Sequence, residues 1–178
     1  MMSITFRTLH AHQQEALREW RNNVQAGDGP VGLWVYGARR AGTTSIARLA
    51  AEHVVMSADL DTLEVVSAHR LCGAIRQSWG ADAVSRAHAN DYDLYVEAQR
   101  GLDGLQRIWS ADMLMVDDLH EETTDMPFWR KYVQAEINER LKARKPLVIA
   151  TDMAPNHPYF SGLQSFIEDL SLTCYAER

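Results

Sequence analysis

The chain has 178 residues, of which 46% are hydrophobic and 24% charged, a balance typical of soluble globular domains. Its formal net charge of −6 argues against a strongly basic nucleic-acid scaffold, although a local basic patch stays open. The apolar runs are far too short for a bilayer, which takes about 20 residues, so no membrane segment is expected. The first residues lack a signal pattern, and Cys72 and Cys174 are too isolated for a metal site. We therefore expect a cytoplasmic protein with reduced thiols.

Strand-like and helix-like segments alternate along the chain. Short apolar runs, each followed by turn or polar residues, predict strands at 31–37, 63–68, 111–120, 146–152 and about 170–175. Apolar residues at helical spacing predict helices at about 11–26, 45–56, 69–80 and 126–144. Residues 91–110 share this spacing, but Gly101 and Gly104 weigh against an unbroken helix.

This alternation predicts a single α/β domain over residues 1–178. Right-handed crossovers between the strands imply a mainly parallel sheet of about five strands, flanked by helices. Residues 1–29 are expected to form an N-terminal helix and linker, and residues 30–178 the core.

The turn after the first core strand carries an incomplete phosphate-binding motif. In the pattern G-x-x-x-x-G-K-[ST], backbone N–H groups wrap phosphates, the lysine reaches the β- and γ-phosphates and the hydroxyl binds Mg²⁺. Residues 37–44 keep both glycines and the final threonine, but Thr43 replaces the lysine. A solvent-facing turn with two arginines is the alternative. The predicted nucleotide-binding residues are Gly37, Arg39, Arg40, Ala41, Gly42, Thr43, Thr44 and Ser45, with Arg39 or Arg40 supplying the missing charge.

Two acids end the strand expected at 111–120. Asp117 can hold Mg²⁺ together with Thr44, and Asp118 can orient the attacking water as a base. The alternative is that these acids only terminate a strand. About seventy residues separate them from the glycine turn, which leaves room for one intervening strand and its helices.

Polar residues also end the strand expected at 146–152. Thr151 can donate a hydrogen bond to the terminal phosphate of a nucleotide, whereas the charge of Asp152 would repel that phosphate. All three segments are expected at the carboxyl edge of the sheet, where open α/β folds bind ligands.

The order VYGARRAGTT, MLMVDDLH, a helix led by tryptophan and KPLVIATDMAP resembles the DnaC/IstB-like branch of AAA+ ATPases. These are bacterial and phage helicase loaders and transposition helper ATPases, and the resemblance covers about residues 30–175. It implies a P-loop NTPase fold with an AAA+ RecA-like core, ATP or ADP with Mg²⁺ as ligands, and no full C-terminal lid. It assigns Walker A to Gly37, Gly42 and Thr44, Walker B to Asp117 and Asp118, and sensor 1 to Thr151 or Asp152.

The chain departs from the family pattern at three places. Thr43 replaces the Walker A lysine, and Asp152 stands where sensor 1 is usually asparagine. No arginine occurs between Arg144 and Arg178, where the resemblance places an arginine finger; the matching helix at 163–170 is acidic. We therefore expect slow ATP hydrolysis or none.

The resemblance implies a helicase-loader-like protein acting in DNA replication of a phage or mobile element. Its expected partner is a replicative helicase or a related replication protein, and homo-oligomer formation stays open. One alternative is a pseudo-ATPase adaptor that binds a replication or transposition protein without nucleotide. Another is direct single-stranded DNA binding through arginines and exposed aromatic residues. The aromatic candidates are Trp79, Trp109, Trp129, Tyr92 and Tyr95, of which Trp129 is expected in the core.

Overall fold

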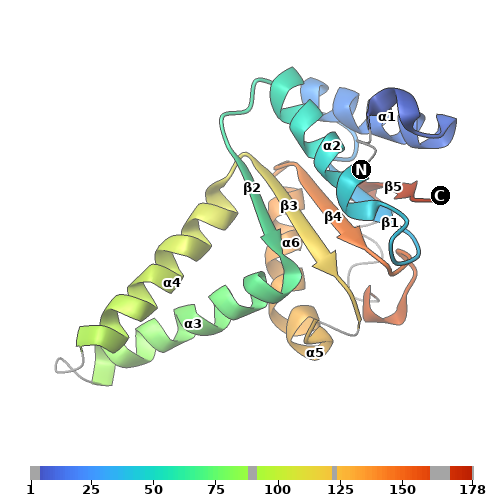
Figure 1. Ribbon diagram of the computed structural model, residues 1–178. Coiled ribbons are helices and arrows are strands. Elements are labelled where there is room, and N and C mark those ends of the chain that lie inside the picture. Colours follow the sequence, from blue (N-terminus) through green and yellow to red (C-terminus); the bar gives the residue numbers. More distant parts are fainter. Residues whose placement is uncertain (1–4, 88–91, 122–123, 161–168, 178) are drawn as a thin grey trace.

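A five-stranded parallel sheet forms the centre of the molecule in a computed structural model (Figure 1). The structure describes residues 5–87, 92–121, 124–160 and 169–177, without the side chains of 80–87 and 92–98. The strand order is β2-β3-β4-β1-β5, and every neighbouring pair is parallel, which confirms the predicted sheet. The strands are β1 (Gly32–Tyr36), β2 (Leu63–Ser67), β3 (Met113–Leu119), β4 (Leu147–Thr151) and β5 (Ser171–Tyr175).

Helices cover both faces of this sheet. On one face, α1 (Ala11–Ala26) packs against β5 and α2, and α2 (Thr43–Ser57) packs against β3 and β4. The other face is covered by α3 (Ala68–Ala87) and by a helical stretch made of α5 (Met126–Phe128), η2 (Trp129–Val133) and α6 (Gln134–Lys142). The described residues also include two short 3₁₀ turns, η1 (Phe6–Thr8) and η3 (Pro158–Phe160).

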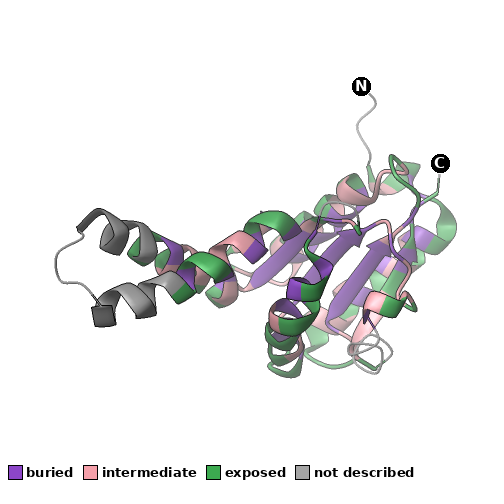
Figure 2. Ribbon diagram, turned by 90° about the horizontal axis from the view of Figure 1, so that it is seen from below, coloured by how far each residue is buried: buried purple, intermediate pink, exposed green. Residues whose placement is uncertain are grey.

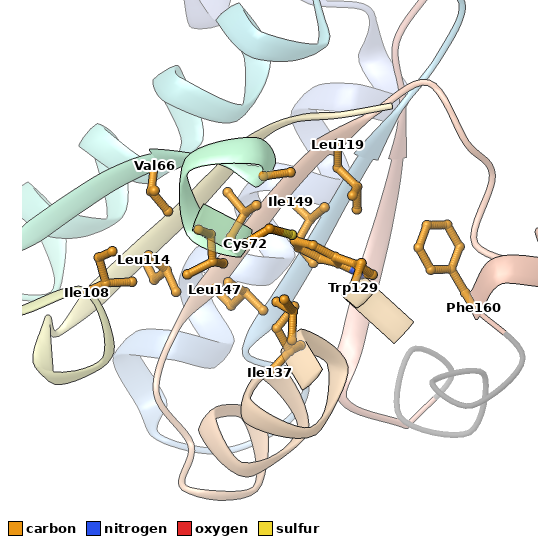
Figure 3. Packing of buried hydrophobic residues seen from close by; sticks show 14 of the residues in the cluster. Val66, Cys72, Ile108, Leu114, Leu119, Trp129, Ile137, Leu147, Ile149 and Phe160 are labelled. Carbon is orange, nitrogen blue, oxygen red and sulfur yellow. The ribbon is translucent and has the colours of Figure 1, made fainter. Parts of the chain in front are cut away.

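The core lies on both sides of the sheet because successive strand residues point to opposite faces. In β1, Leu33 and Val35 pack with α1 and α2, whereas Trp34 packs in the opposite cluster. Figure 3 shows that second cluster, in which Trp129 and Ile137 pack against the strands. Trp129 is fully buried, as predicted, and the strands that end at the site are therefore held from both faces.

The helices α3 and α4 (Tyr92–Ser110) form a hairpin that projects from the edge of the sheet (Figures 1 and 2). The helix predicted at 69–80 extends to residue 87, and α4 continues unbroken through Gly101 and Gly104. A Cβ built on Gly101 would lie 3.0 Å from Cβ of Gln77, so this glycine lets the two helices approach closely. Packing between the helices thus outweighs the cost of a glycine in a helix. None of the described helices combines the length and apolar character that crossing a membrane requires.

The helix predicted at 126–144 is helical but not uniform. Residues Trp129–Val133 form one π-helical stretch between two α-helical segments. Asp125 caps the start of the stretch, because its carboxylate accepts a 3.1 Å hydrogen bond from the backbone N–H of Phe128. Both Trp129 and Val133 are fully buried, so the wider turn serves the packing of this helix on the sheet.

Candidate functional site

A polar cleft of about 380 Å³ lies at the carboxyl ends of β1, β3 and β4. These three strands are neighbours in the parallel sheet, so the loops that follow them meet at one edge. The turn after β1 and the start of α2 form one wall, and the ends of β3 and β4 form the other. The lining residues are Gly37, Arg39, Arg40, Gly42, Thr43, Thr44, Asp118, His120 and Asp152.

A tight turn connects β1 to α2. Arg40 and Gly42 both have positive φ, of 67° and 97°, and the N–H of Ala41 donates a 2.9 Å hydrogen bond to the carbonyl of Ala38. Gly42 caps α2, whose first intrahelical bond runs from the N–H of Ile46 to the carbonyl of Gly42. The N–H groups of the first helical turn therefore lie at the cleft, an arrangement that favours anions.

Gly37 has a packing role besides any role in binding phosphate. A Cβ at this position would lie 2.2 Å from the carbonyl oxygen of Ala176, just after β5. The N–H of Ala176 also donates a 2.7 Å hydrogen bond to the carbonyl of Tyr36. Only glycine allows the chain after β5 to pass this close to the start of the loop.

Thr44 and Asp117 connect the two walls of the cleft. The hydroxyl of Thr44 donates a 2.9 Å hydrogen bond to Oδ1 of Asp117, and the backbone N–H of Asp118 donates to the same oxygen, also at 2.9 Å. The pairing of β3 with β4 shifts register between Val116 and Leu119, and Asp118 has a φ of 54°. This irregularity places Asp117 against Thr44 and exposes Asp118 at the cleft.

His120 is a cleft residue that the sequence analysis missed. Its Nδ1 atom lies 3.1 Å from Oδ1 of Asp152, and its Nε2 atom lies 3.7 Å from Oδ1 of Asp118. Within the described part of the chain, neither His120 Nδ1 nor Asp152 Oδ1 forms an aligned hydrogen bond, although both atoms are buried. The available signal was its position, two residues after the acid pair at the end of a buried strand.

Thr151 lies outside the cleft, in contrast to the position we predicted for a phosphate contact. Its side chain is fully buried and its hydroxyl donates a 2.6 Å hydrogen bond to the carbonyl of Leu119. The same hydroxyl accepts a 3.0 Å hydrogen bond from the N–H of Met153. Thr151 thus fixes the ends of β3 and β4, and Asp152 is the residue of this segment that lines the cleft.

The other predicted site residues divide into two groups. Ala41 and Ser45 are not among the lining residues; Ala41 is half-buried and the side chain of Ser45 is exposed. Asp117 is also not a lining residue, but it accepts the hydrogen bond of Thr44, which is one. The remaining predicted residues line the cleft together: Gly37, Arg39, Arg40, Gly42, Thr43, Thr44 and Asp118.

Thr44, which lines the cleft, and Asp117, its hydrogen-bond partner, fit a magnesium ion that arrives with a nucleotide. Thr44 and Asp117 supply a hydroxyl and a carboxylate oxygen, the donor types that Mg²⁺ prefers. The described residues contain no group of three or more His, Cys, Asp or Glu that could hold a metal. This small donor set matches the usual behaviour of Mg²⁺, which takes one or two protein ligands and completes its shell with phosphates and water.

Several solved structures of DNA replication proteins share this architecture, although no family model and no curated protein sequence matches the chain. The replication initiator DnaA bound to AMPPCP and single-stranded DNA superposes with a TM-score of 0.61 at 15% identity, over 97% of this chain and 47% of its own. The DnaC helicase loader gives 0.57 at 15% identity, over 97% and 96%. DnaI gives 0.59 at 15% identity, over 94% and 86%. The chain spans about half the length of the initiators. It therefore has the AAA+ P-loop fold that DnaC-like helicase loaders share with DnaA.

Proposed function

We propose that this chain is a helicase-loader-like AAA+ protein that binds a magnesium nucleotide in the cleft between β1, β3 and β4. The single observation that carries the proposal is the hydrogen bond between Thr44 and Asp117, at the start of the helix that follows the glycine turn. This contact joins the hydroxyl of the glycine-turn motif to the first acid of the pair at the end of β3, as a shared magnesium site requires. These two oxygen donors would hold Mg²⁺, and the bound ion would neutralise part of the phosphate charge.

Phosphates would meet two kinds of positive groups in this cleft. The first is the set of N–H groups at the start of α2 and in the turn before it. The second is the pair of guanidinium groups of Arg39 and Arg40, which line the same wall. Because both arginines are exposed and Thr43 carries no charge, we expect weaker binding than a lysine-containing loop provides.

The proposed role is in DNA replication of a phage or mobile element, with a replicative helicase or related replication protein as partner. The likeness to DnaC, DnaI and DnaA supports this role through the shared fold. Asp118 lines the cleft. In an active chain it would orient water toward a terminal phosphate, and the chain would be a slow ATPase. A cleft that binds no nucleotide would instead support the pseudo-ATPase adaptor, which the replacement of lysine by Thr43 favours.

Binding of a fluorescent ADP analogue with Mg²⁺ tests the site directly. Asp117→Ala removes an oxygen donor and the acceptor of the Thr44 hydrogen bond, so we expect affinity to fall by at least about tenfold. Asp28→Ala is the matched control, because Asp28 is exposed before β1, away from the cleft-lining residues. Equal affinity in wild type and Asp117→Ala, with both proteins folded, would refute the site.

A second candidate function is contact with single-stranded DNA. Trp79, Phe128 and Tyr132 form an aromatic cluster with ring centroids 4.5 to 5.4 Å apart, and the side chain of Trp79 is 46% exposed. Arg76 lies over the ring of Phe128 at 4.2 Å, and Lys131 lies over Tyr132 at 4.9 Å. An exposed ring beside cations suits a stacked base next to a phosphate. The side chains of Tyr92 and Tyr95, also predicted for stacking, lie outside those described.

Anisotropy of a labelled oligothymidine measures this second function. Stacking on one aromatic ring contributes about 1–3 kcal/mol per base, so Trp79→Ala is expected to weaken binding by about fivefold or more. Affinity should also fall as salt concentration rises, because phosphate contacts release counterions. Trp109→Ala is a comparison variant, since Trp109 is half-buried beside the core. Binding that is insensitive to both salt and Trp79→Ala would exclude this surface.

A further inference from the structure

Acidic groups gather on the wall of the cleft opposite the glycine turn. Asp118 lies in the irregular stretch of β3 between Val116 and Leu119, Asp152 follows β4, and His120 lies between the two carboxylates. The side chain of Asp152 is only 22% exposed, and its Oδ1 atom lies 3.1 Å from His120 Nδ1 without an aligned hydrogen bond. The carboxylate is therefore a mostly buried part of the wall.

The opposite wall keeps the groups that a β-phosphate needs. Gly42 gives the turn its left-handed residue, and the N–H groups at the start of α2 face the cleft. Thr44 and Asp117 retain the oxygen donors for a magnesium ion. These groups act on the phosphate next to the glycine turn, and none of them depends on a third phosphate.

The charges that a γ-phosphate meets are altered in two ways. The lysine of the P-loop pattern reaches the β- and γ-phosphates, and its place is taken by uncharged Thr43. The carboxylate of Asp152 lines the cleft together with that of Asp118, the residue proposed to orient the attacking water. Relative to the P-loop pattern, the third phosphate therefore loses the charge of the lysine and gains that of Asp152, while Arg39 and Arg40 remain in the cleft lining.

Arg39 does not fully restore the balance. Its Nε atom lies 3.9 Å from Oδ2 of Asp152, so a γ-phosphate would compete with this carboxylate for the guanidinium. The contact is half-exposed and modest in strength, but it connects the glycine turn to the acidic wall. Pairwise contacts thus connect Arg39 to Asp152, Asp152 to His120, and His120 to Asp118.

We propose that the cleft selects nucleoside diphosphates over triphosphates, because Asp152 and Asp118 repel the γ-phosphate. His120 acts as a positioning residue that holds Asp152 at the cleft. This inference rests on the proposed nucleotide site and specifies its ligand. When a nucleoside diphosphate and a nucleoside triphosphate are present at similar concentrations, most of the protein would then bind the diphosphate.

Calorimetric titration of the full chain with MgADP and MgATP tests the selectivity. We expect MgADP to bind about tenfold more tightly than MgATP, which corresponds to about 1.4 kcal/mol. The ratio should shrink at high salt, because screening weakens repulsion between partly exposed charges.

Three variants locate the cause of the selectivity. Asp152→Asn keeps the size of the side chain and removes its charge, so MgATP affinity should rise about tenfold while MgADP affinity changes little. Thr43→Lys adds a positive charge on the wall formed by the glycine turn, so it should also raise the affinity for MgATP. Asp28→Asn makes the same charge change outside the cleft and should leave the ratio unchanged.

The outcomes separate the two proposals. Binding of MgATP as tight as that of MgADP in the wild type overturns the selectivity and leaves the nucleotide site standing. An unchanged ratio in folded Asp152→Asn overturns the role of this carboxylate. Failure of both nucleotides to bind overturns the nucleotide site itself, and with it the selectivity. The wild-type ratio needs no variant and stands as a test even where a substitution disturbs folding.

Discussion

Thr44 and Asp117 lie 73 positions apart in the sequence and are joined by a 2.9 Å hydrogen bond. The contact connects the first turn of α2 to the end of β3, although β4 lies between β3 and β1, the strand that precedes α2. We predict that Thr44→Val, which removes the hydroxyl at nearly constant volume, weakens MgADP binding by about tenfold. Thr44→Ser keeps the hydroxyl and should bind like the wild type. Equal binding by Val and Ser variants would show that the hydroxyl has no role.

Gly37→Ala is expected to destabilise the fold itself. The added methyl group would meet the backbone carbonyl of Ala176 at 2.2 Å, so the segment after β5 would have to move. We expect a loss of about 1–3 kcal/mol in the free energy of unfolding, measured with urea. Gly104→Ala is the control, because a Cβ there has no neighbour within 4 Å. Because Gly104 lies in the helix α4, Gly104→Ala should raise the free energy of unfolding by about 0.5–1 kcal/mol. The same sign for both variants would contradict this account.

Arg140 is a buried cation that fastens α6 to the segments before β3 and β4. Its guanidinium donates to the carbonyls of Trp109, Ala111, Asp112 and Pro146 at 2.8 to 3.2 Å. Burial lowers the pKa of Arg140 to about 10, so it stays charged at neutral pH.

Arg140→Met keeps the aliphatic stem but leaves these carbonyls without their donor. We expect it to cost about 2–4 kcal/mol in urea unfolding. Arg130→Met, an exposed change in the same helical stretch, should stay within about 0.5 kcal/mol. The net contribution of one hydrogen bond is about 1 kcal/mol. If Arg140→Met lowers the free energy of unfolding by less than about this amount, water replaces the guanidinium at little cost.

Two buried thiols predict how stability depends on alkaline pH. Burial raises the pKa of Cys174 from 9.0 to about 12 and that of Cys72 from 9.0 to about 11. The unfolded chain therefore loses these protons before the folded chain does. Their contribution to stability is fully present below pH 9 and is lost as the pH rises toward the folded-state pKa values.

Urea unfolding at pH 8, 9 and 10 measures this dependence. We expect the free energy of unfolding to fall above pH 9, by at most about 1.4 kcal/mol per pH unit for each thiol. Cys174→Ala should make this fall shallower. An identical slope in wild type and variant would show that the thiol is not the cause. Iodoacetamide at pH 8 should label neither thiol until the chain unfolds.

The sequence predicted the sheet well because short apolar strands ending in turn residues are a local signal. It also brought Asp117, Asp118 and the glycine turn to one edge, since the carboxyl ends of parallel strands share an edge. The extent of α3 and the continuity of α4 were not predicted, because packing of Gly101 against Gln77 depends on two distant segments. The π-helical turn at Trp129–Val133 likewise follows from tertiary packing.

Side-chain direction was the part of the site that the sequence left undecided. Thr151 and Asp152 are adjacent, and the sequence suggested the threonine for phosphate contact. The shift between β3 and β4 pairs Thr151 with Leu119, so its hydroxyl turns to that carbonyl and Asp152 enters the cleft. His120 reaches the cleft for the same reason. Such choices depend on strand register near a bulge, which no local pattern encodes.

Amide hydrogen exchange with and without MgADP tests the central claim most directly, because it locates the ligand on the chain. The account predicts slower exchange at residues 38–46, which form the glycine turn and the first turn of α2, and at 117–120. Exchange in the α3–α4 hairpin should be unchanged. No protection at residues 38–46 with millimolar MgADP, or protection confined to other segments, would contradict a nucleotide site in this cleft.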